Sequence, residues 1–360
     1  MVASLTDLTA NTYRRSRMAA HTLACIAGGA LFLSLAASAA PARAGSSDLR
    51  LSQLCPSVTV AGNTGCRWVT RSATGITGVA IDLDGKSNFR SLMSELGVVL
   101  APRIPMPADS LGFAGFQVSA DVGVTAINAK RAYWDGVRAV SPSNPSLSRP
   151  DRLQTTVGMF LRKGFWLPVP TVELGGGFVN LLGSQLISWQ GYAKVALHEG
   201  FHDWPVPSVA VRAAVGYVTG TDQLTATTST FDLLFSKGFG VLKTVRLEPF
   251  GGFSWIRIKA RSGIVDFTPA CDSYTLTTSA TPDPSCGAGD ALANAAFPDQ
   301  DAISRYRVLG GAKLKFGILA VLAEYAFYPA GRSRDGREAN GALDQSGGQS
   351  AFTFSAGLHF

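Results

Sequence analysis

The sequence predicts an all-β fold, an antiparallel up-and-down barrel whose strands cross a membrane. Three observations predict it. Segments in which apolar and polar residues alternate recur along most of the chain, and each is long enough to cross a bilayer as a tilted strand. The connections between these segments are short on one side and mostly long on the other. The chain also opens with the pattern of an export signal.

Residues 1–44 have the order of a secretory signal peptide. Arg14, Arg15 and Arg17 precede a stretch of small apolar residues that runs into Ala42-Arg43-Ala44. A basic region, an apolar region and a small-residue cleavage site indicate a leader that is removed. Removal lowers the formal charge from +7 to +4, because the leader carries four arginines and one aspartate. So small an excess argues against a nucleic-acid partner.

Four cysteines follow the leader, in two pairs that are far apart. Cys55 is close to Cys66, and Cys271 is close to Cys286. In an exported chain this spacing predicts two local disulfides, with connectivity across the pairs as the alternative. Neither pair has the C-x-x-C spacing of a zinc site. We expect residues 45–74, which are too few for a domain, to form a periplasmic segment or a plug that reaches into the lumen.

The barrel is expected over residues 75–360. Eleven segments alternate with a period of two, which places apolar side chains on one face of a strand and polar ones on the other. They are 92–101, 112–128, 153–163, 171–183, 187–197, 208–219, 225–237, 245–260, 305–316, 318–328 and 351–360. Backbone groups in lipid require a closed barrel, and bacterial single-chain barrels use an even number of strands. We therefore expect twelve strands, with a weaker segment at 75–84 as the twelfth; ten or fourteen are also compatible.

A soluble β-sandwich is the alternative fold for this pattern. Sandwich strands average five or six residues, whereas the alternating segments here are about twice as long. In a membrane barrel, aromatic residues such as Trp189, Tyr217, Trp255 and Tyr325 would form belts at the two membrane interfaces.

The lengths of the connections predict the orientation. On the side where the last segment ends, the connections are short, as at 317 and 164–170. On the other side, 129–152, 261–304 and 329–350 are long. Barrels of the outer membrane have short periplasmic turns and longer extracellular loops, so the long connections should lie outside the cell.

The last alternating segment carries a resemblance. Phe352, Phe354, Leu358 and Phe360 lie on one face, and the segment ends on an aromatic residue. This resembles the terminal strand of bacterial outer-membrane β-barrel proteins, including porins, although Leu358 stands where an aromatic is usual. The resemblance implies an outer-membrane location with lipopolysaccharide as a neighbour, and recognition of this strand by the barrel-assembly machinery. It implies no particular functional family and no cofactor.

The polar faces of the segments should line the lumen, because a charge that faces lipid costs about 2–4 kcal/mol at the midplane for Arg or Lys. A network of paired charges that fills the barrel and an anion-favouring constriction are both compatible with these residues. A further possibility is that the cations of 257–261 form an outer rim that binds lipopolysaccharide phosphates. The lumen candidates are Glu95, Asp121, Glu173, Lys194, Arg212, Asp232, Arg257, Lys259, Lys313, Lys315 and Glu324.

The stretch His198-Glu199-Gly200-Phe201-His202 matches the H-E-x-x-H pattern of zinc hydrolases. That pattern works on a helix, where residues four apart share a face. Here a β-pattern precedes the stretch, and Pro205 and Pro207 follow it, which predicts a turn and no metal site. No histidine lies near the expected outer rim, where an outer-leaflet hydrolase would need one, so we do not expect an enzyme.

The sequence favours a passive or weakly selective channel for small solutes, on the grounds of a polar lumen and a missing catalytic set. The alternative is a non-conducting barrel that acts as a surface receptor, adhesin or structural anchor through its long loops.

Overall fold

The structure is a computed structural model, and its described residues span most of the barrel. The signal peptide prediction and the cysteines at 55, 271 and 286 lie outside these residues. The described ranges are 47–54, 66–71, 75–103, 105–113, 115–137, 139–141, 144–148, 150–165, 171–199, 206–242, 245–267, 294–334 and 341–360.

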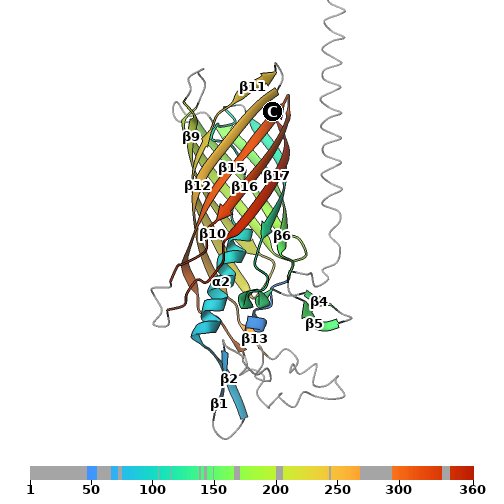
Figure 1. Cartoon of the computed structure of the whole chain (residues 1–360), viewed down its shortest axis with the longest axis vertical. Coiled ribbons are helices and arrows are strands. Elements are labelled where there is room, and N and C mark those ends of the chain that lie inside the picture. The colour runs from blue at the N-terminus through green and yellow to red at the C-terminus, as the bar shows by residue number, and fades with distance from the viewer. Residues whose placement is uncertain are drawn as a thin grey trace, which may run out of the picture. The chain divides into compact units, whose positions relative to one another are not determined.

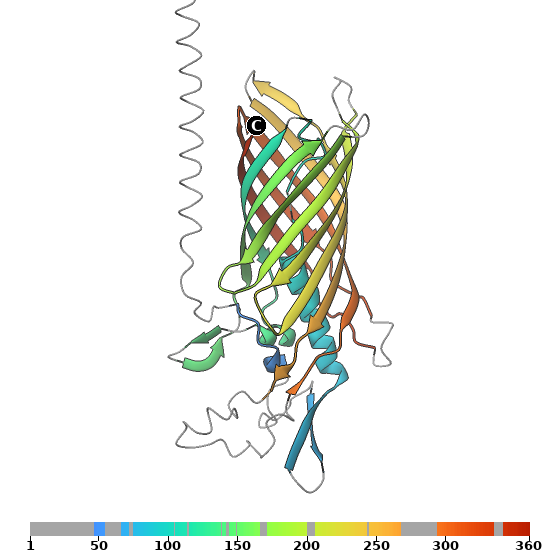
Figure 2. The same cartoon turned by 180° about the vertical axis from the view of Figure 1, so that it is seen from behind.

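Ten antiparallel strands form a closed barrel (Figures 1 and 2). Neighbours along the chain pair with one another, and the β17–β3 pairing closes the ring between the first and last strands. The expectation of twelve strands was therefore wrong, and ten is the count. The strands are β3 (Phe116–Ala126), β6 (Leu153–Phe165), β7 (Thr171–Leu181), β8 (Ile187–His198), β9 (Ser208–Thr219), β10 (Leu224–Ser236), β12 (Val245–Ser262), β15 (Gln300–Phe316), β16 (Leu319–Tyr328) and β17 (Gln349–His359).

Period-two alternation decides which side of the wall each side chain occupies. In β10 every second residue is buried, and the residues between them are mostly exposed. Phe231 points outward with 53 % of its surface exposed, while its neighbour Asp232 is fully buried. The wall is thus apolar outside and polar inside, which is the division of surface that a barrel in lipid requires.

Two segments that the sequence analysis assigned to the barrel wall are not part of it. Residues 92–101 belong largely to helix α2 (Leu83–Val99). Phe89, Leu92, Met93 and Leu96 are spaced three or four apart, which is a helical period and gives α2 one apolar face. Residues 75–81 form strand β2 (Gly75–Ile81), but β2 pairs with β1 (Cys66–Arg71) in a separate hairpin. The barrel starts at 116 and not at 75.

The remaining elements are short and lie in the connections. No helix among the described parts of the chain is both long and apolar enough to cross a membrane. The short elements are η1 (Leu51–Leu54), η2 (Ala132–Gly136), β4 (Ala139–Ser141), β5 (Asn144–Ser148), β11 (Phe239–Leu242), β13 (Val265–Asp266) and β14 (Asn294–Ala295).

The two ends of the barrel differ. We call the end that carries the β3–β6, β12–β15 and β16–β17 connections the long-loop end, and the opposite one the C-terminal end. The segment 47–54 lies at the long-loop end: the Ser47 amide donates to the Gly183 carbonyl (2.9 Å) and the Leu51 amide to the Gln223 side chain (2.9 Å). We expected residues 45–74 to form a periplasmic segment or a plug that reaches into the lumen, and the contacts of residues 47–54 place these at the long-loop end.

The seam between β17 and β3 is fixed at the C-terminal end by the last residue of the chain. The Phe116 amide donates to the Phe360 carbonyl (3.1 Å), and the Phe360 amide donates to the Phe116 carbonyl (2.8 Å). Their rings also lie near each other, with centroids 6.5 Å apart. The ring is therefore closed by backbone hydrogen bonds between residues that are far apart in the sequence.

Candidate functional site: the filled lumen

Helix α2 enters the lumen from the long-loop end (Figures 1 and 2). Its apolar face is buried: the ring of Phe89 stacks on Phe297 with centroids 4.8 Å apart, and Leu92 has no exposed surface. Gly97 packs so closely on Ile258 of β12 that an added Cβ would lie 2.6 Å from the Ile258 side chain. Burial of several such side chains stabilises the helix by about 1.5–3 kcal/mol each.

The polar face of α2 contacts residues at the long-loop end of the barrel. Arg90 donates to Gln300 (2.9 Å) and to the Ser333 hydroxyl (2.9 Å). The Ser94 hydroxyl donates to Asp344 (2.7 Å). Arg305 of β15 reaches the Ser94 hydroxyl (3.0 Å) from the wall. Buried polar groups stabilise a fold only when they are paired, and each of these side chains makes at least one hydrogen bond.

Glu95 is fully buried and accepts three hydrogen bonds. The donors are the Tyr133 hydroxyl, the Trp134 indole (2.6 Å) and the Gly347 amide (2.7 Å). Burial is the largest influence on the pKa of the Glu95 carboxyl and raises it above its usual value, while the three hydrogen bonds lower it by less. The carboxyl joins α2 to the β3–β6 and β16–β17 connections.

Beyond α2 the chain continues through the lumen toward the C-terminal end. Wall side chains donate to its backbone carbonyls along the way. The Ser188 hydroxyl donates to Leu100 (3.0 Å), Arg307 to Pro102 (3.1 Å) and Lys194 to Asp109 (2.8 Å). The Leu111 amide in turn donates to Glu173 of β7 (3.1 Å). Residues 100–103 and 105–111 are therefore held by side chains of the three strands β7, β8 and β15.

Five of the lumen charges form buried ion pairs. Asp232 accepts from Arg212 (2.6 Å) and from Arg307 (2.8 Å), and all three side chains are at most 2 % exposed. Glu173 pairs with Lys194 at 3.1 Å, again with both side chains buried. Removing one partner of such a pair leaves an uncompensated buried charge, which is strongly destabilising.

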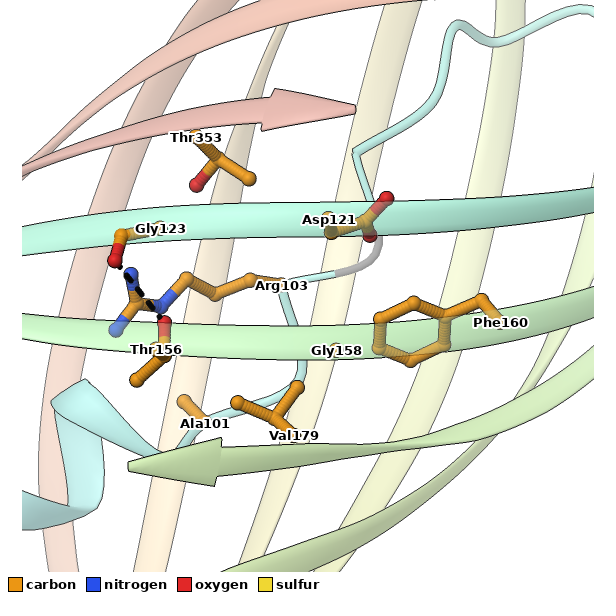
Figure 3. A pocket seen from close by; sticks show the side chains of 9 residues that line it. All are labelled: Ala101, Arg103, Asp121, Gly123, Thr156, Gly158, Phe160, Val179 and Thr353. Carbon is orange, nitrogen blue, oxygen red and sulfur yellow. Dashed lines mark hydrogen bonds between the residues drawn. The ribbon is translucent and has the colours of Figure 1, made fainter. Parts of the chain in front are cut away.

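We call α2 and residues 100–103 and 105–111 the threaded segment, and one cavity between this segment and the wall is small. This cavity has a volume of about 20 Å³, and Arg103, Asp121, Thr156 and Thr353 are among the residues that line it (Figure 3). One Arg103 nitrogen and both Asp121 carboxylate oxygens have no hydrogen-bond partner there. A cavity of this size and polarity suits a buried water molecule that bridges such groups. It is too small for a solute.

Most sequence-predicted lumen residues lie on the inner face of the wall. Lys315 is half-buried and lines a pocket at the C-terminal mouth. Glu95 is buried, but on α2 and not on a strand. The inward-facing wall residues are Asp121, Glu173, Lys194, Arg212, Asp232, Lys313 and Glu324.

Arg257 and Lys259 are the exceptions, because both are exposed on the outer face of β12. This corrects their assignment to the lumen. The residues that face inward at this level are Ile256 and Ile258, both fully buried. They pack beneath the apolar face of α2, which a charge opposite it would disrupt.

Five buried arginines are not among the residues predicted from the sequence. Arg305 and Arg307 share the inner face of β15 with Lys313, and Arg162 alternates with the outward residues of β6, so the same period-two argument could have found them. Arg90 and Arg103 belong to the threaded segment, and strand alternation gives no signal for them.

The H-E-x-x-H stretch is only partly described. His198 ends β8, and the Glu199 carboxylate accepts a hydrogen bond from the Ser110 amide (2.8 Å), while 200–205 lie outside the described ranges. Within the ranges that are described, no cluster of His, Cys, Asp or Glu could hold a metal ion.

No protein-family profile matches the chain, and no curated protein matches it. Among solved structures, Ail of Yersinia pestis is 11 % identical and aligns over 69 % of this chain and 99 % of its own, with a TM-score of 0.24. OmpT of Vibrio cholerae is 12 % identical over 82 % of this chain and 75 % of its own (TM-score 0.25). The translocator domain of NalP from Neisseria meningitidis is 10 % identical over 74 % and 92 % (TM-score 0.32).

These structures are outer-membrane barrels of different roles, and the likeness does not choose between the roles. The chain's own geometry supplies the fold. Its ring of ten strands is closed, apolar outside and polar inside. The chain is therefore a closed antiparallel β-barrel with the two faces that membrane-spanning strands require.

Proposed function

We propose that this barrel is closed to ions at rest and serves as an anchor that holds its N-terminal segment and long loops at the cell surface. The observation that carries the proposal is the filled lumen. Helix α2 and residues 100–103 and 105–111 occupy it, and wall side chains donate hydrogen bonds to them. The segment 47–54 then emerges at the long-loop end, which outer-membrane barrels direct outside.

A surface tag tests the anchor role. An epitope inserted just before Ser47, in the full chain that retains residues 1–44 for export, should bind antibody on intact cells, since Ser47 lies at the long-loop end. A matched tag after Gly317, in the turn between β15 and β16 at the C-terminal end, should bind only after the outer membrane is permeabilised. The opposite pattern would reverse the orientation and contradict the proposal.

Conductance tests the closed state. The refolded chain without residues 1–44, reconstituted in a planar bilayer, should give no discrete current steps. Reconstitution into vesicles, with heat-dependent gel mobility as the sign of a folded barrel, serves as the control for insertion. Frequent openings of the unmodified chain would exclude a lumen that is closed at rest.

A passive channel for small solutes is the second candidate, and one observation favours it. The wall pairs its own charges, as Asp232 does with Arg212 and Glu173 with Lys194, so the lumen would remain polar without α2. In this case, a variant that lacks residues 45–103 should show discrete openings with a mild preference for anions.

A further inference from the structure

Three cations form a row on the outer face of β12. Arg257, Lys259 and Arg261 are exposed, and their spacing of two places them on the same face. Adjacent members of the row are roughly 7 Å apart along the strand. We call these three residues the β12 cation row.

Few acids balance the row. Arg261 pairs with Asp299 at 3.2 Å, but both side chains are more than half exposed, so the pair contributes little. Arg257 and Lys259 form no ion pair with any other residue that the structure describes. Three cations this close repel one another unless an anion from outside the chain lies beside them.

The position of the row relative to the membrane follows from strand register. Trp255 stands opposite Phe231 of β10 and Tyr306 of β15, and all three are about half exposed. Such an aromatic row marks a membrane interface. The cations come next along β12 toward the long-loop end. With strands tilted by 35–45°, they lie roughly 5–15 Å beyond the aromatic row, at the level of lipid headgroups.

The strands beside the row are polar at this level. Ser229 and Ser304 stand opposite Arg257, and Thr227 and Thr225 stand opposite Lys259 and Arg261. In the half of the barrel at the long-loop end, the other described strands have no Lys or Arg on the outer face. The cations are thus concentrated on one side of the barrel, which a general attraction to the membrane surface would not require.

We propose that the β12 cation row binds the phosphate groups of lipopolysaccharide, with its acyl chains against Phe231, Trp255 and Tyr306. Arginine presents a planar fork of donors that matches phosphate oxygens, and clustered cations next to a membrane select anionic headgroups. The proposal uses the outward orientation of the long-loop end and does not depend on whether the lumen is closed.

The test measures binding of purified lipid A to the full refolded mature chain in detergent by native mass spectrometry. The variant Arg257→Ser/Lys259→Ser/Arg261→Ser should bind lipid A with two phosphates at least about tenfold more weakly than the unmodified chain. The matched control, Lys130→Ser/Arg131→Ser/Arg152→Ser, removes three exposed cations from the β3–β6 connection at the same end and should bind within about twofold. Charge reversal by Lys259→Glu alone should also weaken binding.

A second lipid separates phosphate recognition from general lipid contact. Lipid A stripped of both phosphates should bind the unmodified chain and the β12 variant equally. Equal loss of phosphorylated lipid A in the β12 variant and the control would attribute binding to net charge and overturn the proposal. So would a β12 variant that retains full affinity, or one that loses the stripped lipid as well. Heat-dependent gel mobility verifies that every variant is folded.

Discussion

Asp232 balances the charge of two buried arginines in the lumen, because it forms an ion pair with each of them. Asp232→Asn leaves Arg212 and Arg307 without their carboxylate in a place that water does not reach. We expect the free energy of unfolding to fall by about 3–5 kcal/mol. Urea unfolding of the chain in lipid vesicles, followed by tryptophan fluorescence, measures it.

The control for this variant is Asp222→Asn, which removes an exposed carboxylate from the β9–β10 turn. A surface change of this kind alters stability by about 0.5 kcal/mol or less. If the two variants unfold at the same urea concentration, the two buried ion pairs of Asp232 do not contribute as described.

Glu95 offers a second residue-scale test. Glu95→Ala removes the acceptor of three donors, from Tyr133, Trp134 and Gly347. Each buried donor left without a partner costs about 1–3 kcal/mol, so α2 should be bound less firmly to the loops. We expect faster hydrogen exchange of the α2 amides than in the unmodified chain, with the exchange of β8 amides unchanged. Equal exchange in α2 would contradict the role given to this carboxyl.

For single residues, the alternation of period two predicted which wall side chains face inward. It did not predict which segment of the chain fills the lumen. Asp121, Glu173 and Arg212 could be placed because lipid excludes charge from the other face. Arg257 was placed wrongly in the lumen, because its part of β12 lies beyond the aromatic row. An outward charge there contacts headgroups and water and not the lipid interior. Alternation identifies the two faces of a strand. Only the three-dimensional structure shows whether a face contacts lipid, headgroups or the lumen.

Among the elements, α2 is the one whose packing can be loosened selectively. Gly97→Leu would drive a side chain into Ile258, whose atoms already lie 2.6–3.0 Å from the position of a Cβ. Overpacking of this kind costs about 1–3 kcal/mol. We expect the variant to show current steps in a planar bilayer where the unmodified chain is silent.

Two further variants make this test specific. Ile258→Ala combined with Gly97→Leu should restore silence, because it returns the missing space. Gly191→Leu adds the same side chain on the outer face of β8, where the nearest atom to a Cβ is 3.9 Å away, and should remain silent. Silence of Gly97→Leu alone would show that the lumen accommodates a shifted helix.

Helix α2 also explains why the element count was wrong. Residues 92–101, which include the end of α2, satisfy a strand pattern and a helical one at once, since Leu92, Met93 and Leu96 are also spaced by three and four. The barrel wall surrounds α2 and supplies partners for its polar residues, so its composition does not differ from that of a strand. The helix forms because it is buried inside the barrel, and a local sequence pattern does not indicate that burial.

The whole molecule depends on the closing strand. A chain that lacks 349–360 loses the pairing of β17 with both β16 and β3, which exposes two edges to lipid. We expect such a chain to show no heat-dependent shift in gel mobility after refolding. Phe360→Ala, which retains the backbone pairing with Phe116, should still show the shift. A folded form of the truncated chain would mean that the ring closes by another pairing.

The barrel, the inner and outer faces and the nine connections between consecutive strands could be located from the sequence, since they depend on local alternation and loop length. The register of the closing pair of strands, such as Ser355 opposite Asp121, could not be predicted, because β17 and β3 are far apart in the sequence. The threaded segment was missed for the same reason.

The seam and the threaded segment together set an order of events in assembly. A chain that runs lengthwise through a closed ring must either be surrounded while the ring is still open or be passed through it afterwards. Because Phe360 completes the β17–β3 seam, the first route requires α2 to wait beside an unfinished wall until the last residue is in place. The slow step of folding is then the pairing of β17 with β3, which closes a loop of more than two hundred residues. The rate of unfolding in turn depends on the barrier to opening this seam.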